Sequence, residues 1–173
     1  MKRIGFVLVA YLCLTSPVLA KDMTGRLALG FNSLFANTFG YSSTPALSLK
    51  YALSPAFQTQ GILGFVSRET GSNSFTLGVR FLSNFVREDN MNLYGVLGAG
   101  FLRDGADPAR GIPETTDAGR LQLGTGLEFF FFDFPNLGFS VEVGVDFFFT
   151  DQQTIVGVNS GSFELVGIHY YFN

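Results

Sequence analysis

Residues 137–150, LGFSVEVGVDFFFT, alternate between large apolar residues and small or acidic ones, with Phe148 as the only break. Such period-two alternation predicts a β-strand, because successive side chains of a strand point to opposite faces. The polar face combines glycine and serine with Glu142 and Asp146, which is typical of a crowded polar interior. The apolar face is therefore expected to point outward, and an outward apolar face requires lipid.

The same pattern recurs along the chain and predicts eight strands, over residues 25–31, 45–53, 56–66, 74–82, 91–102, 120–130, 137–150 and 163–172. Strands of about ten residues cross a bilayer when tilted by ~45°. The first, third, fifth and seventh connections are expected to be longer and polar, whereas the second, fourth and sixth are expected to be tight. This asymmetry predicts an all-β, eight-stranded antiparallel transmembrane β-barrel of up-and-down topology, with both termini in the periplasm.

Residues 1–20 are predicted to be a secretory signal peptide. Lys2 and Arg3 precede a short apolar run, and Ala20 is a suitable last residue before cleavage. Residues 21–173 then form one barrel domain. Without Lys2 and Arg3 the chain has 9 basic residues (11 − 2) against 14 acidic ones, a net charge of −5, which argues against nucleic acid as a partner. Cys13 lies in the predicted leader, so no disulfide is expected.

The C-terminus carries Gly167, followed at fixed offsets by the aromatic residues Tyr170 and Phe172. This pattern resembles the insertion signal of outer-membrane barrels, which the barrel assembly machinery reads. Over residues 25–172 the chain resembles the small eight-stranded porin-like proteins of the Gram-negative cell envelope (the OmpA, OmpX and opacity-protein group). The resemblance implies an outer-membrane location, but it assigns no functional residues.

Several charged residues fall on the predicted inward face. Each buried ion costs several kcal/mol unless it is paired, so these residues are expected to form an interior ion-pair network in a filled polar lumen. The alternative is a gate, in which exchange of ion-pair partners opens a narrow channel for ions or small solutes. The predicted network consists of Lys50, Arg80, Glu128, Glu142, Asp146 and Glu164.

Four arginines, Arg68, Arg103, Arg110 and Arg120, lie in or beside the predicted outer loops. Arginine binds phosphate through two parallel hydrogen bonds, which makes these residues candidate contacts for lipopolysaccharide. An equally simple interpretation is ordinary loop charge, balanced by neighbouring acidic residues. Outer-membrane lipid and lipopolysaccharide are the expected partners, and the barrel is expected to be a monomer.

The sequence offers little support for catalysis. A lipid A-modifying enzyme with a histidine-containing triad is the third alternative. His169 is the only histidine, and no serine follows it two residues later, which argues against such a triad. Glu142 and Asp146 lie four residues apart on one strand, about 13 Å, which is too far for a glycosidase pair. A metal site needs several ligands, and no cofactor motif is present. The expected role is non-enzymatic, in envelope structure or in surface interaction through the loops.

Overall fold

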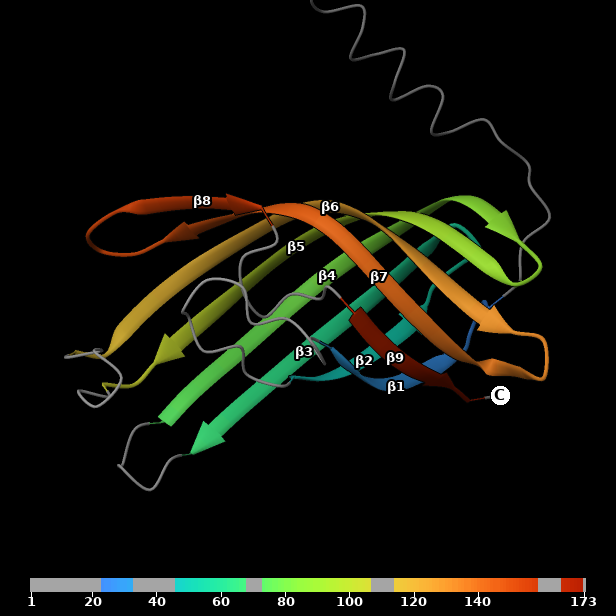
Figure 1. The fold of residues 1–173 in the computed structure, drawn as a ribbon, viewed down its shortest axis with the longest axis horizontal. Coiled ribbons are helices and arrows are strands. Elements are labelled where there is room, and N and C mark those ends of the chain that lie inside the picture. Colours follow the sequence, from blue (N-terminus) through green and yellow to red (C-terminus); the bar gives the residue numbers. More distant parts are fainter. Residues whose placement is uncertain (1–22, 33–45, 68–72, 107–113, 159–165, 173) are drawn as a thin grey trace, which may run out of the picture.

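The computed structural model describes residues 23–32, 46–67, 73–106, 114–158 and 166–172, which form one antiparallel β-sheet that closes on itself (Figure 1). No helix that could cross a membrane is found within these ranges. The strands in these ranges are β1 (Leu27–Asn32), β2 (Ala46–Ala52), β3 (Phe57–Ser67), β4 (Asn73–Glu88), β5 (Met91–Asp104), β6 (Thr116–Phe131), β7 (Phe134–Phe149), β8 (Thr154–Val158) and β9 (Val166–Tyr171).

Each strand from β1 to β7 pairs with the next one along the chain. The ring closes because β9 pairs with β7 on one side and with β1 on the other. The remaining strand, β8, pairs with the other half of β7, at Val145 to Phe149. The predicted eight-stranded, up-and-down antiparallel barrel is therefore confirmed, and β8 and β9 share the edge of β7 that the single predicted strand at 163–172 was expected to occupy.

The seventh connection differs from the prediction. A loop was expected over residues 151–162, but the chain turns between Phe149 and Thr154 and returns as β8 (Figure 1). The Thr150 hydroxyl closes this turn, since it donates to the Gln153 carbonyl and accepts from the Gln153 amide. The prediction was wrong because polar residues on both sides hid a short strand, Thr-Ile-Val-Gly-Val, that has little apolar alternation of its own.

Two further connections are shorter than predicted. Residues 84–90 were expected to be a charged link, yet β4 continues to Glu88 with a register shift between Asn84 and Val86. Residues 133–136 were expected to be a turn, yet β7 already begins at Phe134. Charged residues and proline are compatible with strand ends, where a missing ladder hydrogen bond costs little.

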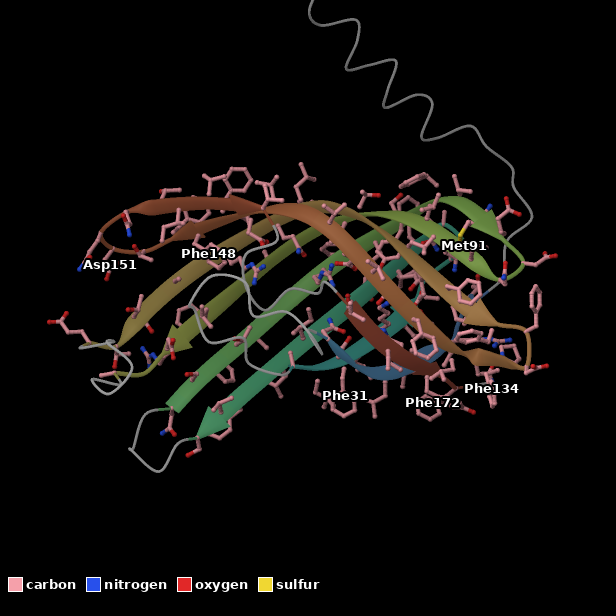
Figure 2. The ribbon with its side chains drawn as sticks, viewed as in Figure 1. Phe31, Met91, Phe134, Phe148, Asp151 and Phe172 are labelled. Carbon is pink, nitrogen blue, oxygen red and sulfur yellow. The ribbon has the colours of Figure 1, made fainter. Side chains whose placement is uncertain are left out.

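The two faces of the barrel wall have opposite chemistry. Buried residues alternate with exposed ones along the strands, and large apolar side chains stand out on every strand. Figure 2 shows this outward layer, with Phe134 and Phe172 near one end and Asp151 near the other. The lumen instead holds lysine, arginine, glutamate, glutamine and histidine side chains. A surface of this kind is stable only in hydrocarbon, so the barrel is a transmembrane one.

Candidate functional site

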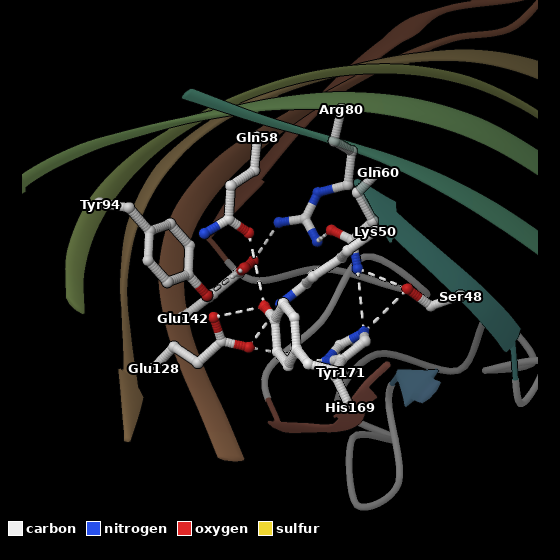
Figure 3. A network of polar contacts seen from close by, with 10 residues as sticks. All are labelled: Ser48, Lys50, Gln58, Gln60, Arg80, Tyr94, Glu128, Glu142, His169 and Tyr171. Atoms are coloured by element: carbon white, nitrogen blue, oxygen red, sulfur yellow. Dashed lines mark hydrogen bonds and ion pairs between the residues drawn. The ribbon is translucent and has the colours of Figure 1, made fainter. Parts of the chain in front are cut away.

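The lumen holds a network of polar side chains, and its first ion pair joins opposite walls (Figure 3). Lys50 Nζ on β2 lies 3.1 Å from Glu128 Oε1 on β6, and both side chains are buried. The other oxygen of Glu128 accepts a 2.8 Å hydrogen bond from the Tyr171 hydroxyl on β9. Gln58 Oε1 lies 3.4 Å from the same hydroxyl. Glu128 therefore has a cation and a hydroxyl as partners.

His169 lies beside this pair and connects it to β2 and β3. Its Nε2 atom is 2.9 Å from Ser48 Oγ and 3.3 Å from Gln60 Nε2. Gln60 Nε2 in turn donates to Ser48 Oγ at 2.6 Å. On the other side of the ring, Nδ1 lies 4.0 Å from Glu128 Oε1.

The second ion pair joins Arg80 on β4 to Glu142 on β7, again across the lumen (Figure 3). Arg80 Nη1 also donates to Gln60 Oε1 at 2.8 Å, so Gln60 links this pair to Ser48 and His169. The Tyr94 hydroxyl donates to Glu142 Oε1 at 2.8 Å. Side chains from seven strands, β2, β3, β4, β5, β6, β7 and β9, thus meet in one set of contacts that spans the lumen.

A third ion pair corrects one sequence-based expectation. Arg120 was predicted to lie beside an outer loop, at the first residue of the strand over residues 120–130, but it is buried and its Nη2 atom lies 2.7 Å from Asp146 Oδ2. Its guanidinium also lies 4.8 Å from the centre of the Phe148 ring. The reason is the length of β6, which begins at Thr116 and therefore includes Arg120 well inside the strand. Arg120 lies two residues before the inward residue Gln122 and so points to the same face, the lumen.

Ser48, His169 and Glu128 are arranged in the sequence of contacts of a serine-hydrolase triad, with the histidine between the serine and the acid. The sequence did not predict this grouping, because Ser48 and His169 lie on different strands. The distance of 4.0 Å between His169 Nδ1 and Glu128 exceeds a hydrogen bond. All three side chains are buried among other polar groups, whereas a triad needs space for a reacting carbonyl beside the nucleophile. In this structure the three side chains are packed within the polar network. No cluster of three metal-ligating acid, histidine or cysteine residues occurs in the described part of the chain.

Neither a protein-family model nor a curated protein matches this chain. A solved structure, that of Ail, the attachment invasion locus protein of Yersinia pestis, is similar to it. The two share 17% sequence identity with a TM-score of 0.43, over 86% of this chain and 99% of that chain.

The other candidate residues fall into three groups. Arg68, Arg110 and Glu164 lie outside the described residues. Arg103 is exposed and makes two hydrogen bonds to Asp117, of 2.7 and 2.6 Å. In the proposed insertion signal, Tyr170 and Phe172 face outward with their ring centres 5.3 Å apart, whereas Gly167 faces the lumen.

Glycines make room for the large luminal side chains, and Gly30 beside His169 is the clearest case. The two residues are opposite each other on β1 and β9. A Cβ atom at Gly30 would lie 2.1 Å from the Ile168 carbonyl oxygen and 2.5 Å from His169 Cδ2. Gly30→Ala is therefore expected to lower the free energy of unfolding by about 1–3 kcal/mol, the usual cost of overpacking.

Gly61→Ala is the matched control, because a Cβ atom at Gly61 would meet nothing within 4 Å. Urea unfolding of both variants in lipid vesicles measures the difference. Equal unfolding midpoints for the two variants would contradict the close packing of β1 against the His169 ring.

Proposed function

We propose that this protein is an integral outer-membrane β-barrel whose lumen is closed by its ion-pair network, and that it acts non-enzymatically in envelope structure or surface interaction. The observation that carries the proposal is that three cations and three carboxylates pair inside the lumen: Lys50 with Glu128, Arg80 with Glu142, and Arg120 with Asp146. The network is neutral as a whole and links opposite walls, as expected of a filled interior rather than of a pore lined by one sign of charge.

Apolar side chains add to the filling. Within the described residues, buried clusters form from Leu82, Tyr94 and Val96, and from Ala46 and Ile62. Combined with the polar network, these clusters leave the lumen side chains with almost no exposure to solvent. A packed lumen stiffens the wall, which suits a scaffold that presents loops.

Two features support the outer membrane and a role for the loops. A closed antiparallel barrel and a predicted signal peptide together are typical of outer-membrane proteins. The chain between β5 and β6, from Gly105 to Thr115, is longer than the turn after β4 or β6. We propose that the barrel end carrying the connection between β5 and β6 faces outward and that both termini are periplasmic. A lipopolysaccharide phosphate would have to replace Asp117 as the partner of Arg103.

Conductance across planar lipid bilayers tests the proposal. The purified, folded barrel is expected to give no steady single-channel current in salt solution, whereas a general porin inserted in the same bilayers serves as the positive control. Regular current steps from this protein, absent from a heat-denatured sample, would overturn the closed lumen in favour of a narrow channel.

A further inference from the structure

The chain enters the barrel through a tight turn that places one methionine in the lumen. Gly25 has a φ angle of 77°, a left-handed conformation that suits glycine. The Arg26 amide donates to the Met23 carbonyl at 2.9 Å, and the Gly25 amide donates to the Ala52 carbonyl at 2.8 Å. These bonds fix the turn against the end of β2. Arg26 Nη1 also donates to Asn136 at 3.1 Å, which ties the turn to β7.

Met23 is only 2% exposed, although it is the first described residue. It packs in a buried apolar cluster with Ala28, Ala52, Phe130 and Tyr171. These four residues come from the ends of β1, β2, β6 and β9 that lie at one end of the barrel, called here the terminal end. Methionine is flexible and fills irregular gaps well, so it is suited to pack among side chains from these four strands.

The polar network begins directly behind this apolar cluster. Tyr171 belongs to both: its ring lies 5.6 Å from the Phe130 ring, and its hydroxyl donates to Glu128 at 2.8 Å. Glu128 and Lys50, the next residues inward, are 1% and 0% exposed. The Met23 cluster therefore lies against the Tyr171, Glu128 and Lys50 side of the network at the terminal end.

We infer that the Met23–Arg26 turn is a hydrophobic stopper that seals the terminal end of the barrel, and that its release admits water and small ions to the network. Narrow apolar constrictions block conduction by excluding water, which is the effect expected of Met23 among Phe130 and Tyr171. The turn lies outside the strands and is bonded to the wall at Ala52 and Asn136, so its release requires those bonds to break but leaves the strands themselves paired. This inference rests on the closed lumen proposed above and identifies what closes one end.

A buried reporter thiol tests the stopper. Ser48→Cys in a Cys13→Ser background places a single thiol inside the network of the full-length protein, folded in detergent micelles. A small, charged methanethiosulfonate reagent is expected to modify this thiol slowly. Adding Met23→Gly is expected to raise the modification rate by about tenfold or more, because labelling follows the opening of the seal.

Met91→Gly is the matched control, since Met91 begins β5 at the terminal end but is absent from the Met23 cluster (Figure 2). It is expected to leave the labelling rate unchanged, and Met23→Leu is expected to keep the seal. An unchanged rate in folded Met23→Gly would overturn the stopper, as would an equal rise in Met91→Gly.

Folding of each variant is checked by its heat-dependent mobility on gels. If Met23→Gly does not fold, Met23→Ala takes its place, and the parental rate in that variant would overturn the inference. Rapid labelling of the parent Ser48→Cys protein would instead contradict the closed lumen of the proposed function. The failure of the stopper and the failure of the proposed function are therefore distinguishable.

Discussion

Replacing Arg80 by methionine is expected to lower the free energy of unfolding by about 3–5 kcal/mol, because it leaves a buried carboxylate without its cation. That carboxylate is Glu142, which also accepts a hydrogen bond from the neutral Tyr94 hydroxyl. Gln60 Oε1 would lose its hydrogen bond from Arg80 as well. Urea unfolding in lipid vesicles, followed by tyrosine fluorescence and gel mobility, measures the change.

Two further variants separate this effect from a general loss of charge. Glu142→Gln in the Arg80→Met background is expected to recover much of the lost stability, since both charges are then gone. Arg103→Met removes the exposed pair with Asp117, and a much smaller change is expected there because solvent screens that pair. Arg80→Met with unchanged stability and a new single-channel current would instead favour a gate.

Val143→Arg is expected to cost about 2–4 kcal/mol, the range for arginine on the lipid face of a barrel near the bilayer centre. Val143 is 53% exposed on the outer face of β7, and it pairs with Thr125 on the neighbouring strand β6. Folding yield and urea midpoint in vesicles measure the effect.

Thr115→Arg is the control, because Thr115 lies in the exposed segment before β6. Its folding yield is expected to remain near that of the wild type. If both variants fold and unfold alike, the outer face of β7 does not contact hydrocarbon.

The alternation of residue types was sufficient to predict the barrel and the inward direction of particular side chains. The structure places Lys50, Arg80, Glu128, Glu142 and Asp146 in the lumen, as their parity along the strands indicated. Parity is reliable here because one face must contact lipid and the other must not, so a shift of one residue would expose every charge to hydrocarbon.

The choice of partners could not be predicted in the same way. Contacts across a lumen depend on the tilt and stagger of the strands, which the pattern of a single strand does not contain. Ser48 and His169 are separated by 121 positions in the chain and meet only because the barrel closes between β1 and β9. Arg120 was predicted to be at a strand end, as a candidate loop contact, because the residues before it hid the true start of β6 at Thr116.

The contact between Arg80 and Gln60 also determines where the proton of the His169 ring lies. Arg80 donates to Gln60 Oε1, so the amide nitrogen of Gln60, which can only donate, is turned toward Ser48 and His169. The contact between Gln60 Nε2 and His169 Nε2 then makes the ring nitrogen the acceptor, and a neutral ring in that arrangement carries its proton on Nδ1, toward Glu128. The tautomer of the single imidazole in this protein is therefore set by a guanidinium on another strand, and the ¹⁵N shifts of that ring would record whether the guanidinium is in place.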